Sequence, residues 1–127
     1  MRIKLLSVLV DDQDKALKFY TEKLGFIKKT DMPLGEHKWL TVVSPEEQDG
    51  TEIVLEPMGF QPAQVYQKAL FEAGIPYTAF HVDDVQKEYE RLLGLGVVFS
   101  IPPTPMGMVT LAVFNDTCGN NIQIVQV

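Results

Sequence analysis

The chain has 127 residues, of which 46% are hydrophobic and 22% charged, and it carries a net charge of -6 and one cysteine. This length and composition suit a soluble globular domain that buries its own core without disulfides or structural metal. The acidic balance argues against nucleic acid or an anionic membrane surface as a partner, and no apolar stretch approaches the roughly 18 residues of a membrane span. Because no signal-peptide pattern is present either, we expect a cytoplasmic protein.

The first part of the chain predicts a strand, a helix and three further strands. Residues 3–10, IKLLSVLV, alternate in two apolar sets, which is typical of a strand covered on both faces. Asp11 or Asp12 can cap the following helix, and Gly25 stands where that helix ends. The three further strands are predicted over residues 26–30, 38–43 and 52–56.

The second part of the chain repeats this order. Val10-Asp11-Asp12 recurs as Val82-Asp83-Asp84 at an offset of 72, and Leu24-Gly25 recurs as Leu95-Gly96 at an offset of 71. The second helix is therefore one residue shorter than the first. Strands are predicted over residues 77–82, 97–101, 108–114 and 121–125, and the Pro- and Gly-rich residues 101–109 are expected to hold a connection at a cavity mouth.

This repeat predicts a single domain made of two βαβββ modules. Module 1 covers residues 1–58, a helical linker covers 61–75, and module 2 covers 76–127. One such module cannot cover both faces of its own sheet. We therefore expect an α+β fold in which the two modules form a curved eight-stranded mixed sheet around a cavity.

The paired modules, the segment LVDDQDKALKFYTEKLGF and the late segment FNDTCGNNIQI resemble the vicinal oxygen chelate superfamily. This superfamily groups glyoxalase I, bleomycin-resistance proteins and extradiol dioxygenases. The resemblance extends over essentially the whole chain. It implies the glyoxalase/bleomycin resistance/dihydroxybiphenyl dioxygenase fold, a small-molecule ligand and a homodimer.

Members that use a metal take one ligand from the first strand and one from the last strand of each module. The resemblance places these ligands at Leu5, Glu56, Tyr77 and Gln123. Leu5 cannot donate an electron pair, Tyr77 is a weak ligand while protonated, and Gln123 stands where the metal enzymes usually carry Glu. We therefore expect no divalent metal and no other cofactor.

Strand alternation extends this set to the rest of the pocket, because Ser7 shares a face with Leu5 and His81 with Tyr77. Glu56 and His81 are the candidate catalytic residues. Glu56 either contacts a ligand or pairs with a basic side chain at the rim, and His81 either contacts a ligand or is a neutral histidine bonded to a neighbour. Trp39 is either a core aromatic or a stacking wall. The candidate ligand-binding residues are Leu5, Ser7, Trp39, Glu56, Tyr77, His81, Met108 and Gln123.

These residues predict a metal-independent small-molecule binding protein of the glyoxalase/bleomycin-resistance type. The alternative is an enzyme of the same fold, a glyoxalase-like lyase or a dioxygenase-like protein, which would use Glu56 and His81 with a degenerate or absent metal site. A second alternative is a structural dimer without pocket chemistry.

Overall fold

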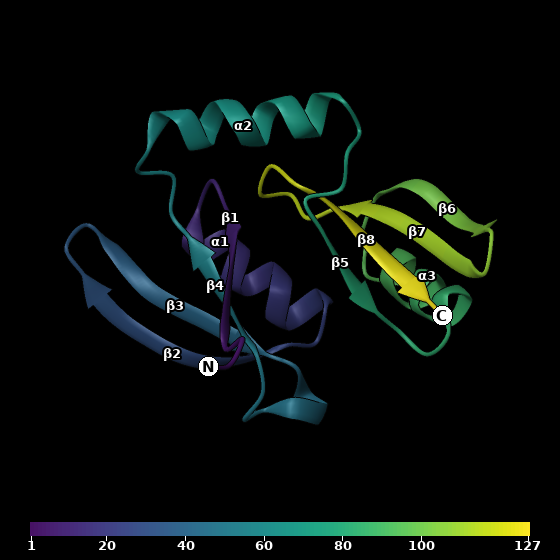
Figure 1. Ribbon diagram of the computed structural model, residues 1–127, viewed down its shortest axis with the longest axis horizontal. Helices are drawn as coiled ribbons and strands as arrows, with labels where there is room; N and C mark the ends of the chain where they lie inside the picture. The colour runs from purple at the N-terminus through teal and green to yellow at the C-terminus, as the bar shows by residue number, and fades with distance from the viewer. The chain divides into compact units, whose positions relative to one another are not determined.

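The computed structural model describes all 127 residues and divides into two compact units, Met1–Val65 and Tyr66–Val127. Each unit contains one βαβββ module, and the boundary between them falls inside the helix α2 (Gln61–Glu72). The repeat predicted from the sequence is thus confirmed (Figure 1). The eight strands form two four-stranded mixed sheets, one in each unit, and not one continuous hydrogen-bonded sheet.

The first unit orders its strands β1-β4-β3-β2, so that β1 and β2 are its edges. β1 runs parallel to β4, and the other neighbours are antiparallel. Helix α1 continues directly into a short π-helix, η1, and a 3₁₀ turn, η2, precedes β4. The bounds are β1 Leu5–Leu9, α1 Gln13–Lys18, η1 Phe19–Lys23, β2 Ile27–Leu34, β3 His37–Val43, η2 Pro45–Glu47 and β4 Glu52–Glu56.

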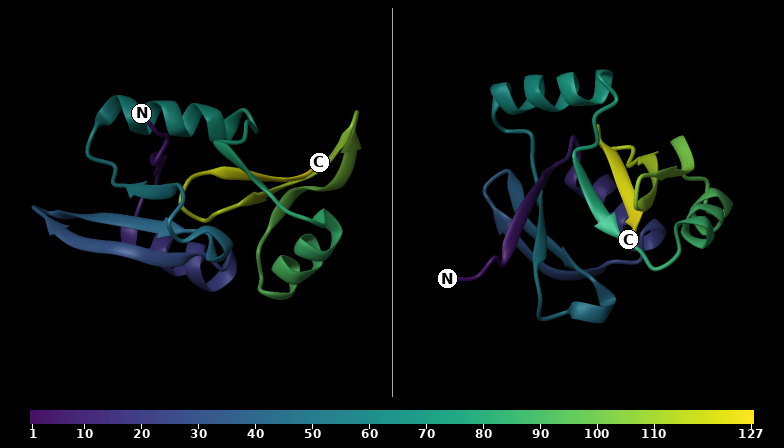
Figure 2. Two further views of the ribbon diagram at one scale, coloured as in Figure 1. Left: turned by 60° about the horizontal axis from the view of Figure 1, so that its bottom comes forward. Right: turned by 45° about the vertical axis from the view of Figure 1, so that its right-hand side comes forward.

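The second unit has the same topology, with the strand order β5-β8-β7-β6. β5 is parallel to β8, and β8, β7 and β6 are antiparallel neighbours. Figure 2 presents β7 and β8, in green and yellow, from two further directions. The bounds are β5 Thr78–His81, α3 Val85–Gly94, β6 Phe99–Met106, β7 Val109–Asn115 and β8 Asn121–Gln126.

An aspartate caps the module helix in each unit. The carboxylate of Asp12 accepts from the backbone N–H of Lys15 at 3.0 Å, and that of Asp84 accepts from Lys87 at 3.1 Å. Both aspartates are extended and satisfy one of the backbone donors that a helix start leaves free. Of the two cap candidates in the first module, the structure therefore selects Asp12.

The π-helix η1 accounts for the one-residue difference between the two helices. Leu24 donates its backbone N–H to Phe19 O, five residues back, whereas Leu95 in the second unit bonds Leu92 O. A π-type turn takes up one extra residue without changing where the chain leaves the helix. Both helices then end at a glycine with positive φ, Gly25 at 86° and Gly96 at 85°.

Two predicted boundaries were wrong, and both lie in edge strands. β2 continues to Leu34 and β6 to Met106, so most of residues 101–109 are strand and Gly107-Met108 form the turn. Prolines suggested loops here, but proline is tolerated in an edge strand, where one side of the backbone has no partner. In α3, Leu92 is buried, whereas the next residue, Leu93, is exposed.

The linker helix α2 is largely exposed, and Gln67 is its one buried residue. The helix ends through a bond from Ile75 N–H to Leu70 O and the positive φ of Gly74. No helix in the structure combines the length and apolar character needed to cross a membrane.

Candidate functional site

Helix α1 packs against β3 and β4 and covers one face of the first sheet. Four side chains on that face are buried: Val8, Leu40, Val42 and Leu55. Because strand side chains alternate, the residues between them point to the opposite side. We call this side, which faces away from α1, the open face of the first sheet, although Thr41, Val43 and Val54 on it are buried. Its residues on the three strands β1, β4 and β3 are Leu5, Ser7, Leu9, Glu52, Val54, Glu56, His37, Trp39, Thr41 and Val43.

The strand register places these residues in rows across the open face. Ser7 lies opposite Val54, and Val54 lies opposite Thr41. Trp39 and Glu56 are each two residues beyond the Thr41–Val54 pair and so share this face. The register thus places the half-buried indole of Trp39 on the open face and not on the face beneath α1.

Two carboxylates stand on this face, and each accepts a hydrogen bond from a hydroxyl. Ser7 Oγ donates to Glu56 Oε1 at 3.0 Å, and Thr41 Oγ1 donates to Glu52 Oε1 at 2.8 Å. Thr41 Oγ1 in turn accepts from the backbone N–H of Thr30 at 3.2 Å. The hydroxyls therefore orient Glu52 and Glu56, whereas a salt bridge to a basic side chain is found for neither.

Exposed apolar side chains surround these polar groups. Leu5 on β1 is 47% exposed, and Met32 and Leu34 on β2 are 54% and 61% exposed. Met32 lies opposite Trp39 in the β2–β3 ladder. An apolar surface with a few oriented polar groups is the usual composition of a small-molecule site.

The second sheet also has an open face, on the side away from α3. Ala79 lies opposite Gln123, and Gln123 lies opposite Val113. His81 lies opposite Val125, two residues beyond Gln123, so His81 and Gln123 share this face. Leu111, Val113 and Val125 form a buried apolar cluster here, with Ile101 and Val109 packed against it. The side chain of His81 is exposed.

Two predicted site residues lie at the margins of the second unit. Tyr77 precedes β5, and its ring lies 6.5 Å from that of Tyr66 in an edge-to-face arrangement. Met108 occupies the tip of the β6–β7 turn and is 98% exposed. Of the predicted set, the second sheet thus brings together His81 and Gln123, whereas Met108 stands apart from them.

The register also shows which positions of the two modules are equivalent. Ser7 and Ala79 correspond through the repeat, and their partners are Val54 and Gln123. Leu9 and His81 also correspond through the repeat. Leu9 pairs with Glu56 and His81 pairs with Val125, so Val125 is the counterpart of Glu56. Gln123 is therefore the counterpart of Val54 and not of Glu56. Nowhere does the structure gather three or more His, Cys, Asp or Glu side chains that could hold a metal ion.

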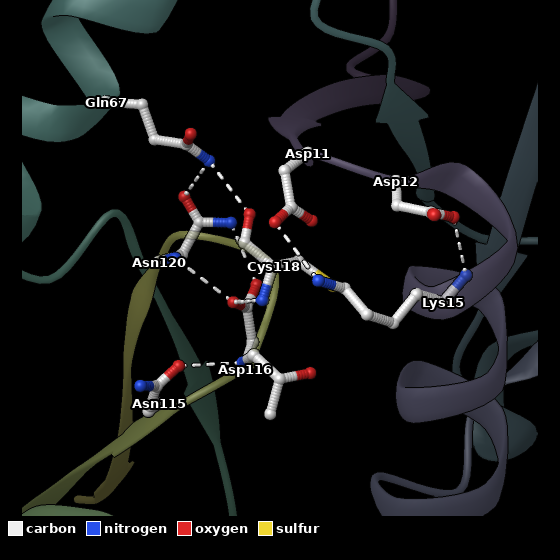
Figure 3. A network of polar contacts seen from close by, with 9 residues as sticks. Asp11, Asp12, Lys15, Gln67, Asn115, Asp116, Cys118 and Asn120 are labelled. Carbon is white, nitrogen blue, oxygen red and sulfur yellow. Dashed lines mark hydrogen bonds and ion pairs between the residues drawn. The ribbon is translucent and has the colours of Figure 1, made fainter.

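Sequence reasoning missed a buried polar network in the loop before β8 (Figure 3). Asp116 is fully buried, and its Oδ1 accepts from the backbone N–H groups of Cys118 at 2.7 Å and Asn120 at 3.0 Å. Gln67 donates to Asn120 Oδ1 at 3.0 Å and to Cys118 O at 3.2 Å, which ties α2 to this loop. The signal in the sequence was the polar run Asn115 to Asn121 around Gly119.

A surface pocket of about 260 Å³ lies elsewhere in the first unit, lined by residues at the start of α1, the start of β3 and the end of β4. Lys38 Nζ lies 2.6 Å from Asp14 Oδ1 at its wall. The hydrogen bond from Lys38 to Asp14, and the charge of Asp14, raise the pKa of Lys38 above 10.5.

Comparison with known proteins agrees with this architecture. The chain is 60% identical over 126 residues to the protein YurT of Bacillus subtilis (strain 168), with 99% of each chain covered. The crystal structure of UcmS2 superposes with a TM-score of 0.87 at 34% identity, covering 100% of this chain and 98% of that one. The crystal structure of TnmS3, an antibiotic binding protein from Streptomyces sp. CB03234, superposes with a TM-score of 0.76 at 29% identity, covering 99% of this chain and 95% of that one.

The family assignment rests on nearly the whole chain. Residues 2–124 match the Glyoxalase/Bleomycin resistance protein/Dioxygenase superfamily. The two βαβββ modules are the fold of the solved relatives, which include a superfamily member from Sphaerobacter thermophilus DSM 20745 at a TM-score of 0.77. The chain is therefore a member of the Glyoxalase/Bleomycin resistance protein/Dioxygenase superfamily, also called the vicinal oxygen chelate superfamily.

Proposed function

We propose that this protein binds a small, largely apolar molecule on the open faces of its sheets and does not change it chemically. The observation that carries the proposal is the open face of the first sheet, where exposed Leu5, Met32 and Leu34 surround two oriented carboxylates and Trp39. The similarity to TnmS3, an antibiotic binding protein, supports the same class of function. The ligand class is then an apolar compound that a planar aromatic side chain can stack against.

We propose further that binding needs no resident metal. The fold family uses divalent ions in some members, and such an ion needs about three protein donors. Among the positions expected to ligate it, Leu5 has no donor atom, and Gln123 offers a neutral amide opposite Ala79. Glu56 is the one carboxylate of the set, and it accepts a hydrogen bond from Ser7. This donor set does not fit a divalent ion.

A homodimer is part of the same proposal. β1 is an edge strand, and Leu5 and Leu6 on its two faces are both exposed, as is Ile3 just before it. Apolar area of this extent at a sheet edge favours association with a second copy. Sedimentation of the purified protein at micromolar concentration should give twice the chain mass, and a monomer there would contradict this part.

Trp39 is the one tryptophan of the chain, so its fluorescence reports on the open face of the first sheet. We expect the neutral apolar probe N-phenyl-1-naphthylamine to quench Trp39 in a saturable way, with and without EDTA. Leu5→Asn should weaken binding about tenfold, since full burial of a leucine contributes about 1.5–3 kcal/mol and about half of Leu5 is exposed for the probe to cover. Leu6→Asn is the matched control, because Leu6 is similarly exposed but points to the other face of β1.

Equal effects of the two substitutions would place the probe elsewhere and contradict the proposal. Turnover of a glutathione hemithioacetal that depends on added metal and disappears in Glu56→Ala would replace the binding function with the enzymatic alternative.

A further inference from the structure

We propose that the ligand of the open face of the first sheet carries a cationic group, such as a protonated amine, beside its apolar body. This inference rests on the proposed binding function and adds the charge of the ligand to it. The charge of the ligand follows from two observations. The first is the set of charged residues on each open face, and the second is the set of hydrogen-bond acceptors on the first sheet that no protein group occupies.

The strands of the second sheet contain no Asp, Glu, Lys or Arg. Its open face therefore offers a ligand only neutral polar groups, such as Gln123, and the imidazole of His81. This sheet cannot select for or against a charged ligand through a permanent charge of its own.

The open face of the first sheet carries two carboxylates, no lysine or arginine, and one histidine, His37, at the start of β3. Lys38, the basic residue of β3, points to the other face with Leu40. Lys28 lies opposite Val42 on that other face too, and Lys29, in the bulge of β2, donates to Gln48 O at 2.7 Å. Glu52 and Glu56 thus give this face an uncompensated negative charge.

The hydroxyls on this face have already used their protons. Ser7 and Thr41 each carry one hydroxyl hydrogen, and these hydrogens point to Glu56 Oε1 and Glu52 Oε1. The Oε2 atom of each glutamate accepts no hydrogen bond from the protein. The face therefore presents free acceptors on half-buried carboxylates, and a ligand must bring the donors.

A cationic donor satisfies this arrangement better than a neutral or anionic one. A hydrogen bond between a charged donor and a carboxylate is about twice as strong as a neutral one, and half-burial reduces screening by solvent. An anionic ligand would meet two like charges, with no lysine or arginine on this face to offset them. Binding at Glu56 also leaves the ligand's apolar body near Trp39, which shares this face.

Three probes that share one ring system test the inference: 9-aminoacridine is a cation near neutral pH, acridine is neutral, and acridine-9-carboxylate is an anion. Equilibrium dialysis against the purified full chain measures the affinity for each. We expect 9-aminoacridine to bind at least about tenfold more tightly than acridine, which corresponds to one charge-assisted hydrogen bond. Acridine-9-carboxylate should bind most weakly.

Glu56→Gln should remove most of the preference for the cation, so that 9-aminoacridine and acridine then bind with similar affinities. Glu46→Gln is the matched control, because it removes one negative charge from the exposed turn η2, away from the open face. It should leave all three affinities as they are, which separates a local carboxylate from the net charge of -6.

The outcomes separate this inference from the proposed function. If all three probes bind equally, or if the anion binds best, the ligand charge inferred here is wrong and the binding function stands. If none of them binds, both are overturned. A preference for the cation that Glu46→Gln and Glu56→Gln reduce equally would reflect net charge alone and would also overturn the inference.

Discussion

The side-chain amide of Gln13 forms hydrogen bonds with both the backbone N–H and the backbone C=O of Lys38. The Lys38 N–H donates to Gln13 Oε1 at 3.0 Å, and Gln13 Nε2 donates to Lys38 O at 2.8 Å. The same amide donates to Leu55 O at 2.8 Å. Lys38 and Leu55 directly precede Trp39 and Glu56, so one side chain at the start of α1 fixes the backbone next to both open-face residues.

Gln13→Ala is therefore expected to lower the free energy of unfolding by about 1–3 kcal/mol, because it leaves part-buried backbone groups without partners. It should also move the fluorescence emission of Trp39 in the folded protein. Gln48→Ala is the control, since the exposed amide of Gln48 makes one long bond of 3.4 Å to Pro45 O. If the Trp39 emission were the same in Gln13→Ala and wild type, Gln13 would have no positioning role.

Gly119 lies against the Gln67 amide so closely that an added side chain would have to displace this amide from its bonds to Cys118 O and Asn120 Oδ1. Its φ is +97°, and an added Cβ would come within 2.8 Å of Gln67 Oε1. Gly96 has a similar φ of +85° but open space around it. Gly96→Ala should thus lower the free energy of unfolding only by the backbone strain, about 1–3 kcal/mol. Gly119→Ala should lower it by more.

The Gln67→Ala background separates the two contributions. In that background the extra cost of Gly119→Ala over Gly96→Ala should largely disappear, as measured by urea unfolding. If the extra cost persisted, the clash with Gln67 would not be its cause.

Much of this fold followed from the sequence because its signals are local and repeated. The alternation in residues 3–10 placed Ser7 and Leu5 on one face, and the recurrence of Val-Asp-Asp and Leu-Gly aligned the two modules. Both signals depend on spacing along one segment, which the sequence contains directly.

Other features depended on partners distant in the chain. The bond from Ser7 to Glu56 and the pairing of Gln123 with Ala79 are set by strand register, which no single segment specifies. Gln67 resembles any surface glutamine of an exposed helix, and only its contacts with Asn120 and Cys118 make it a buried anchor.

The pair of Lys38 and Asp14 should depend on pH in the alkaline range. Asp14 raises the pKa of Lys38, so the stability from this pair is complete below 10.5 and is lost as the pH rises through the raised pKa. Asp14→Asn should lower the pKa of Lys38 toward its ordinary value, as followed by NMR of the side-chain resonances. Asp11→Asn is the control, because Asp11 pairs with Lys15 instead. A pKa of Lys38 that did not change in Asp14→Asn would contradict this assignment.

The two module helices should respond differently to the loss of one residue. Deletion of Glu22, an exposed residue in η1, should convert the π-turn into the shorter helix end found in the second unit. Buried Phe19 and Tyr20 precede the deletion and keep their places, and Gly25 still ends the helix.

Deletion of Glu90 is the comparison, because α3 contains no surplus residue that could compensate for it. This deletion rotates the following turn by about 100° and carries buried Leu92 off its face. We expect that deletion to cost about 2–5 kcal/mol, as for truncation of a buried leucine, and the deletion of Glu22 to cost clearly less. Urea unfolding of the two variants measures the difference, and equal losses of stability would show that η1 does not hold the surplus residue.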